Sequence, residues 1–230
     1  MGEVAGAWAE AAHWYPDVVA AGGLSQAWQA ELDRLRTPSW VRPRIVDNPR
    51  SATVERGDRR ADLLLSPRRR QFYLALRAGQ PTALQGFAPD LTTTAGAARQ
   101  WVSGERPGQV AAAWPWLGSV ALAEARERGD RRAARWLWLH ENHCADQVAT
   151  RLGGFVALAF HEPRLRALYP YTSHWNLSFS TTSQWPFTRD HPVVAPGADA
   201  GRYVVGTRDG RVHDETDAAG ALRLVLAEWD

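Results

Sequence analysis

Apolar residues in the first part of the chain recur at the spacing of a helix. An amphipathic helix places apolar side chains three or four residues apart, so that they share one face. This spacing predicts a helix from Asp17 or Val18 to about residue 35, interrupted near Gly22-Gly23. The apolar positions that carry it are Leu24, Trp28, Leu32 and Leu35.

The next segment is predicted to form two β-hairpins. Short apolar segments flank Gly57-Asp58 and Ala78-Gly79, which are residue pairs typical of tight turns. The first hairpin is expected over Ser51–Glu55 and Ala61–Leu65, and the second over Gln71–Leu76 and Thr82–Phe87.

The middle of the chain is predicted to be helical. One helix begins near Leu91, with one of the three threonines at 92–94 as its N-cap. A second helix spans Ser119–Arg128. Asp130 is the expected N-cap of a third, which runs to about Leu152 and is stopped by Gly153-Gly154.

Strands return in the last part of the chain. Polar and apolar residues alternate over Thr172–Ser180, which predicts a single strand. Its two faces would carry Ser173, Trp175, Leu177 and Phe179 on one side, and Thr172, His174, Asn176, Ser178 and Ser180 on the other. Asp209-Gly210 predicts a hairpin between Tyr203–Gly206 and Val212–Asp214. Thr216 or Asp217 caps a final helix.

These elements predict an α+β fold, in which strands from both ends of the chain form an antiparallel sheet with helices on one face and a helical middle segment. Gln71–Trp101 and Tyr203–Trp229 share the order strand, turn, strand, helix. That order suggests a duplicated ββα unit, although unrelated ββα units are common. We expect a single domain over residues 1–230, with sub-units 1–104 and 105–230 as the alternative.

The composition excludes several classes of protein. All 27 basic residues are Arg, so mechanisms that need a lysine, such as Walker A phosphate binding and Schiff-base chemistry, are excluded. A single Cys excludes an intramolecular disulfide framework and a Cys-rich zinc site. The hydrophobic content of 45% is that of a globular chain, and a net charge of +2 is too small to argue for nucleic acid.

The length of the apolar runs and the charges of the first residues indicate where in the cell the protein is expected. The longest apolar runs are far shorter than the roughly 20 residues of a membrane span. The first ten residues carry two glutamates and no basic region, which argues against a signal peptide. We therefore expect a cytoplasmic protein that binds neither a membrane nor nucleic acid.

Phosphate and cofactor motifs are absent from the sequence. It contains no Gly-x-Gly-x-x-Gly pattern and no metal-binding Asp-x-Asp loop, so we expect no cofactor. Arginines occur in short runs at Arg59-Arg60, Arg68–Arg70 and Arg131-Arg132. The run at 68–70 could hold a phosphate group or an acidic peptide, and a solvated surface is the alternative.

The densest group of chemically active residues is His140-Glu141-Asn142-His143-Cys144. Histidines three residues apart share a helix face, but the zincin motif needs four and nothing nearby supplies further ligands, so we expect no metal. Glu141 lies on the apolar side of the predicted helix, where a carboxylate is either paired or has a shifted pKa. A structural pair with an arginine is one interpretation. The other makes Glu141 and His140 candidate catalytic residues.

His174 lies on the hydroxyl-rich face of the predicted strand. A histidine there suits general acid–base catalysis, and a structural or solvent-facing histidine is the alternative. Adjacent strand residues point to opposite faces, so we expect no pair between Ser173 and His174. Residues on or beside this strand that could bind a polar ligand are Tyr169, Tyr171, Asn176, Ser178 and Arg189.

The chain contains 12 Trp, which suit both cores and binding surfaces. Two pairs are spaced two residues apart, and helical residues at that spacing point to nearly opposite sides. We assign core positions to Trp28, Trp138, Trp175 and Trp229. We assign a ligand or partner surface to Trp114 or Trp116, Trp136 and Trp185.

The segment Leu168–Trp175 is followed by Leu177, Phe179 and Ser180. Five further segments belong with it: Val41-Arg42-Pro43-Arg44, Trp114-Pro115-Trp116, Ala121–Gly129, Pro192-Val193-Val194 and Gly201-Arg202-Tyr203. Together these segments resemble an actinobacterial family of natural-product biosynthesis proteins with a domain of unknown function, and the first segment is the most specific. The resemblance implies a biosynthetic gene cluster in a high-GC host, and it implies no reaction.

Three hypotheses for the function follow. The leading one is a biosynthetic protein that acts on an aromatic or peptide intermediate by cofactor-independent acid–base catalysis, such as cyclisation, elimination or isomerisation. The second is a non-catalytic accessory protein that binds a peptide or a biosynthetic enzyme. The third is a self-resistance or immunity protein.

Overall fold

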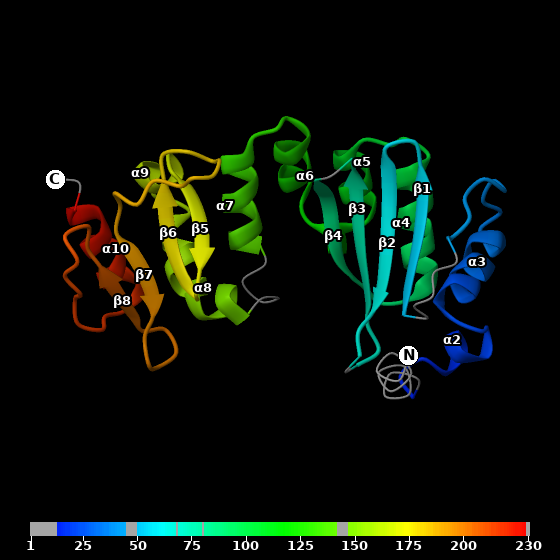
Figure 1. The fold of residues 1–230 in the computed structure, drawn as a ribbon, viewed down its shortest axis with the longest axis horizontal. Helices are drawn as coiled ribbons and strands as arrows, with labels where there is room; N and C mark the ends of the chain where they lie inside the picture. The colour runs from blue at the N-terminus through cyan, green and yellow to red at the C-terminus, as the bar shows by residue number, and fades with distance from the viewer. Residues whose placement is uncertain (1–12, 45–49, 68, 80, 142–146, 229–230) are drawn as a thin grey trace. The chain divides into compact units, whose positions relative to one another are not determined.

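The protein folds into two compact units (Figure 1). The computed structural model describes residues 13–44, 50–67, 69–79, 81–141 and 147–228. The chain divides into unit 1, Met1–Glu127, and unit 2, Arg128–Asp230. Each unit contains a four-stranded antiparallel sheet with helices packed against it, so the predicted α+β class is confirmed. The strands form two separate sheets, and not the one sheet expected from both ends of the chain. Whether the units act as one domain or two stays a prediction.

The sheet of unit 1 is a meander in the order β1-β2-β3-β4. Both predicted hairpins form, because Gly57 (φ 60°) and Gly79 (φ 62°) supply the left-handed conformation that these turns need. The strands are β1 (Ser51–Arg56), β2 (Arg59–Leu65), β3 (Phe72–Ala78) and β4 (Thr82–Ala88).

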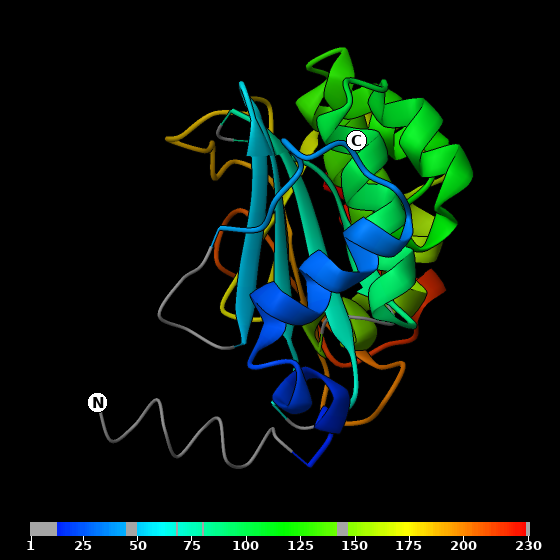
Figure 2. The ribbon, with the colours of Figure 1, turned by 90° about the vertical axis from the view of Figure 1, so that its right-hand side faces the viewer.

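Helices pack against one face of this sheet, as Figure 2 shows for α3 and α4. The predicted break at Gly22-Gly23 is confirmed, since it separates α2 from α3. Asp90, and not a threonine, caps α4, and its carboxylate accepts the Thr93 N–H at 2.7 Å. The helices of unit 1 are α2 (Pro16–Ala20), α3 (Leu24–Arg34), α4 (Leu91–Val102), α5 (Pro107–Ala113), the 3-10 helix η1 (Pro115–Leu117) and α6 (Val120–Glu127).

The two faces of this sheet carry different residues. The face toward the helices joins a core that includes Trp28 of α3 and Trp101 of α4. The opposite face carries a row of Leu64, Tyr73 and Phe87 on three adjacent strands, with Leu64 and Phe87 exposed. Unit 1 therefore presents a partly apolar sheet face.

Unit 2 repeats this layered arrangement with other elements. Leu177, Phe179 and Val205 lie on the sheet face that packs against the helices. The strands, in the order β5-β6-β7-β8, are β5 (Tyr169–Ser173), β6 (Asn176–Ser180), β7 (Val193–Pro196) and β8 (Tyr203–Gly206). The helices are α7 (Arg131–Glu141), α8 (Gln147–Ala159), α9 (Pro163–Arg166) and α10 (Ala218–Ala227).

The segment Thr172–Ser180 is a β-hairpin, and the prediction of a single strand was wrong. Ser173 pairs with Asn176, so His174 and Trp175 form a two-residue turn. Their φ angles of 48° and 71° are the left-handed values of a type I′ turn. This turn lacks the Asn-Gly or Asp-Gly pair that is typical of such turns, so no local pattern predicts it.

Gly153-Gly154 does not end a helix, contrary to the prediction. α8 continues through both glycines to Ala159. The Tyr203 hydroxyl approaches the helix there and accepts the Phe155 N–H at 3.2 Å. A Cβ at position 154 would lie 2.7 Å from that hydroxyl oxygen, so Gly154 is needed for the close packing of β8 on α8.

The predicted duplication of a ββα unit is not confirmed. β3, β4 and α4 form the first unit as expected, but residues 212–214 form no strand. Val212 makes only an isolated bridge to Gly206, and β8 pairs instead with β7. Asp217 caps α10, with its carboxylate accepting the Gly220 N–H at 2.7 Å.

Among the described residues, no helix has the length and apolar character needed to cross a membrane.

Candidate binding site

The β5 strand of unit 2 presents alternate side chains on the sheet face away from the helices. Side chains two apart on a strand share a face. Pro170 and Thr172 pair with Phe179 and Leu177, which belong to the core face. Tyr169, Tyr171 and Ser173 therefore lie on the opposite face.

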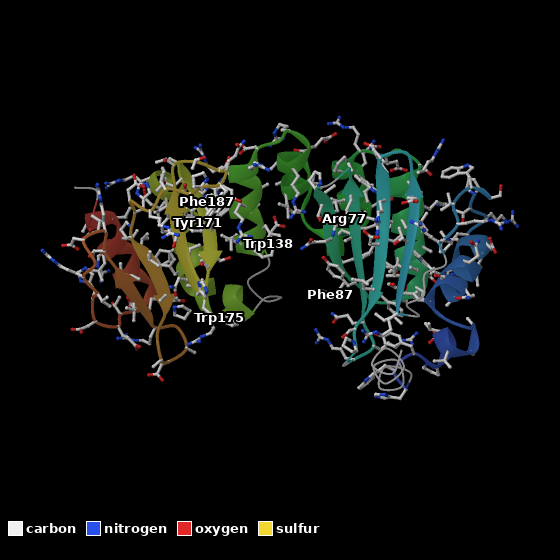
Figure 3. The ribbon with its side chains drawn as sticks, in the orientation of Figure 1. Arg77, Phe87, Trp138, Tyr171, Trp175 and Phe187 are labelled. Atoms are coloured by element: carbon white, nitrogen blue, oxygen red, sulfur yellow. The ribbon has the colours of Figure 1, made fainter. Side chains whose placement is uncertain are left out.

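A loop covers part of this face with a second set of aromatic rings. The Phe187 ring stacks on Tyr171 with centroids 4.5 Å apart, and on Tyr169 with centroids 5.6 Å apart. Trp185 meets Phe187 edge-on at 5.9 Å and is 77% exposed. We call these four residues, Tyr169, Tyr171, Trp185 and Phe187, the aromatic cluster; Figure 3 shows Tyr171 and Phe187 beside each other.

The buried Ser180 hydroxyl holds the loop in place. Its oxygen accepts the N–H groups of Thr182 at 3.1 Å and Thr188 at 3.0 Å. The Thr188 hydroxyl lies 3.1 Å from the same oxygen and accepts the Thr181 N–H at 3.0 Å. The Thr188 hydroxyl also hydrogen-bonds the Asp190 carboxylate and lowers its pKa. Ser180 and Thr188 therefore fix both ends of the loop and orient the rings between them.

The hairpin turn brings Ser173 and His174 together, which the sequence argument excluded. The Ser173 hydroxyl lies 3.0 Å from His174 Nδ1. The exclusion assumed an extended strand, whereas the left-handed turn rotates the imidazole back toward its neighbour. Trp175 is 49% exposed, so its assignment to the core was wrong.

His140 and Glu141 occupy the end of α7, in different surroundings from His174. The His140 ring stacks on Phe160 with centroids 4.2 Å apart and lies edge-on to His161 at 6.2 Å. Both His140 and Glu141 are half-buried. His143 and Cys144 lie outside the described residues. Within the described ranges, no group of three or more His, Cys, Asp or Glu side chains could hold a metal ion.

The tryptophans proposed for a ligand surface have separate environments. Trp136 is fully buried, with its indole N–H donating to the Leu168 carbonyl at 2.9 Å. Trp138 is half-buried beneath the Arg135 guanidinium at 4.6 Å, so the core and surface assignments of this pair were reversed. Trp114 and Trp116 are partly buried against the core of unit 1.

The remaining candidates lie around the aromatic cluster. Asn176 and Ser178 share the sheet face of Tyr169 and Tyr171, where Ser178 is 8% exposed. Arg189 is exposed in the loop. The structure thus gathers Tyr169, Tyr171, Ser178, Asn176 and Trp185 on one side of unit 2.

Phe187 joins this cluster at its centre and was missed from the sequence. Its only signal was its place two residues after Trp185 in a Pro-rich loop. A loop folding back over a sheet is a long-range contact that local spacing does not reveal.

Comparison with known proteins adds one match. Neither the comparison with curated proteins nor that with solved structures finds a match. The sequence resemblance to proteins with a domain of unknown function is confirmed in its coarser part, while the actinobacterial origin and the biosynthetic role stay predictions. Residues 132–229, and with them nearly all of unit 2, match the model described as "Family of unknown function (DUF6193)".

Proposed function

We propose that unit 2 is a binding module that holds a peptide segment bearing an aromatic side chain, without catalysing a reaction on it. This is the accessory role that the sequence raised as its second hypothesis. The observation that carries the proposal is the aromatic cluster, in which Trp185 is 77% exposed on top of rings already stacked on the sheet.

The exposure of Trp185 is unfavourable unless a ligand covers it. Its indole ring projects into water while its neighbour Phe187 is half-buried. Trp and Tyr are enriched among the residues that dominate binding energy, because they bury a large apolar area with little loss of side-chain entropy. An incoming aromatic or apolar side chain would stack against Trp185 and the edge of Phe187.

The shape of the face suits an extended segment. Tyr169, Tyr171 and Ser173 follow one another at alternate positions along β5. At about 3.3 Å per residue, this row is roughly 13 Å long, which is the length of about four extended residues. Trp175 lies at the far end, at the hairpin turn (Figure 3).

The strand edge itself is poorly suited to pairing with another strand. β5 is an edge strand, but Pro170 has no N–H to donate. The Arg135 guanidinium also donates hydrogen bonds to the Pro170 carbonyl at 3.4 Å and to the Thr172 hydroxyl at 3.0 Å. Recognition would therefore rely on side chains that contact Trp185 and the half-buried rings of the aromatic cluster, with backbone pairing contributing little.

The loop is ordered before a ligand arrives. The hydrogen bonds to Ser180 and the stacking of Phe187 fix its conformation in the free protein. A preorganised site loses less conformational entropy on binding, so more of the contact energy appears as affinity.

The proposal is tested with a random peptide display library panned on the full chain. Enriched peptides are resynthesised with a fluorescent label and titrated by anisotropy. We expect enriched peptides to share an aromatic residue, and Trp185→Ala to weaken them by about thirtyfold, as for a hot spot of about 2 kcal/mol.

Trp40→Ala is the matched control, because Trp40 is also exposed but lies in unit 1, under Arg56. Affinities unchanged in Trp185→Ala, or equally reduced in Trp40→Ala, would refute the proposed site.

Acid–base catalysis by His174 is a second candidate, favoured by one specific contact. The Ser173 hydroxyl within 3.0 Å of Nδ1 would orient the imidazole and leave Nε2 free to exchange a proton with a substrate. The test incubates the full chain with intermediates from a gene-deletion strain. Turnover that disappears in His174→Ala supports catalysis, and turnover unchanged in that variant removes His174 from the reaction.

A further inference from the structure

A cavity of about 410 Å³ lies at the start of α7, within unit 2. It is lined by residues 129–133, Arg166 of α9 and Ser183 of the loop that carries the aromatic cluster. Its volume is within the range of small-molecule sites, and it opens to solvent.

Positive charge dominates the lining. Arg131, Arg132 and Arg166 face the cavity together with a single carboxylate, Asp130. That carboxylate is already engaged as the N-cap of α7, since it accepts the Ala133 N–H at 2.9 Å. In the described part of the chain, neither Arg131 nor Arg132 makes an ion pair with an acidic side chain.

Two arginines at this position oppose the helix dipole. The start of a helix carries partial positive charge, so acidic residues or anions stabilise it and basic residues do not. α7 has no acidic residue in its first turn and begins with Arg131-Arg132. The Asp130 carboxylate at the N-cap supplies one negative charge, and the two arginines leave the start of α7 with net positive charge. A bound anion would offset that excess.

Arg166 is the third cation and is partly removed from water. Its guanidinium lies 4.3 Å from the Phe160 ring centre and 3.4 Å from the Phe160 carbonyl. Burial lowers its pKa from the ordinary value, and the Asp130 charge offsets this in part. A partly desolvated guanidinium gains more from an anionic partner than a fully solvated one does.

We propose that this cavity binds a small anion with phosphate or carboxylate oxygens. Arg131, Arg132 and Arg166 would donate to those oxygens, and the Ser183 hydroxyl would provide a neutral donor. The site is separate from the aromatic cluster and does not depend on peptide binding there.

The test titrates the full chain with sodium pyrophosphate and, separately, with sodium citrate. Isothermal titration calorimetry gives the affinity and amide NMR shifts give the location. We expect saturable binding of one or both anions, shifts centred on residues 131–133 and 183, and weaker binding at higher NaCl. The double variant Arg131→Gln/Arg132→Gln should weaken binding at least tenfold.

The controls separate charge loss from misfolding and identify the source of the anion. Arg223→Gln removes an exposed arginine of α10 outside the cavity and should leave the affinity unchanged. Arg131→Lys/Arg132→Lys keeps the charge and should retain part of the binding. Saturation by pyrophosphate alone indicates a phosphate ligand, and by citrate alone a carboxylate ligand. Binding that never saturates, or that is unchanged in the double glutamine variant, overturns the proposal.

Discussion

Phe187→Ala is the substitution that most directly tests how the aromatic cluster is built. It removes the ring that contacts Tyr171 at 4.5 Å, Tyr169 at 5.6 Å and Trp185 at 5.9 Å. An aromatic pair contributes about 0.5–1.5 kcal/mol beyond its buried area. Since Trp185 is mostly in water, the two tyrosine contacts dominate, and we expect the loop to lose about 2 kcal/mol of stability against local opening.

Amide hydrogen exchange measures this opening directly. In the closed loop the Thr181 N–H donates to the Thr188 hydroxyl, and the Thr182 and Thr188 N–H groups donate to the Ser180 hydroxyl. A loss of about 2 kcal/mol should accelerate their exchange about thirtyfold, because each 1.4 kcal/mol is a factor of ten. The amides of α10 should not change.

Phe87→Ala is the matched control in unit 1. The Phe87 ring has one described aromatic contact, with Tyr73 at 5.3 Å, and lies exposed on a sheet. Its loss should leave the loop amides of unit 2 unaffected. Exchange of Thr181, Thr182 and Thr188 that stays the same in Phe187→Ala would show that ring stacking does not hold the loop.

Three further outcomes test the packing arguments. Ser180→Ala should accelerate hydrogen exchange of the same loop amides at least tenfold, because it removes the hydroxyl that accepts two of them. Ser178→Ala, on the same face of the strand, should have little effect on their exchange rates. Tyr15→Phe removes a buried hydroxyl that accepts the Gln71 N–H at 2.9 Å and lies 2.8 Å from the Arg69 carbonyl oxygen. Urea unfolding should therefore show unit 1 destabilised by about 2 kcal/mol. The control Tyr73→Phe should lower the free energy of unfolding by less than about 0.5 kcal/mol. Burial raises the pKa of the Tyr15 hydroxyl. The neutral hydroxyl therefore contributes stability that is fully present below about pH 10 and is lost as the pH rises through the raised pKa. The loss of stability at alkaline pH should be smaller in Tyr15→Phe than in the wild type, and an equal loss would contradict this linkage.

The elements of unit 1 were predictable because their signals are local. Gly57 and Gly79 mark turns by their conformational freedom, and the apolar alternation between them defines the strands. The helix break at Gly22-Gly23 follows from the same reasoning. Asp90 was overlooked as a cap because three threonines follow it, and only the structure shows which oxygen reaches the Thr93 N–H.

The hairpin of unit 2 shows why a period-two pattern can mislead. Across a two-residue turn the parity of the core-facing residues changes, because Thr172 pairs with Leu177. Even-numbered residues of β5 and odd-numbered residues of β6 then face the core. When the segment is interpreted as one strand, the same alternation assigns Ser173 and Leu177 to one face and gives no indication of the turn at His174-Trp175.

The candidate site was predictable in its strand residues and unpredictable in its loop. Tyr169 and Tyr171 are two apart on β5, so either both or neither lies on a given face. Phe187 reaches them across 16 to 18 positions of chain, and that contact depends on Ser180 holding the loop closed. Such contacts arise from tertiary packing, which no local pattern encodes.

The distribution of paired arginines explains why the anion site belongs to unit 2. In unit 1 the Asp62 carboxylate accepts a hydrogen bond from Arg60 at 2.6 Å and lies 3.3 Å from Arg77, so both arginines have an acidic partner. Arg70 belongs to the arginine run that was considered above as a phosphate site, and it forms an ion pair with Asp17 at 2.7 Å. An anion approaching any of these three arginines would have to displace a carboxylate. At the start of α7 three arginines line the cavity with a single carboxylate, and the partial positive charge of the helix terminus adds to theirs. Arginine side chains, which carboxylates hold at these places in unit 1, therefore leave a net attraction for an anion in unit 2.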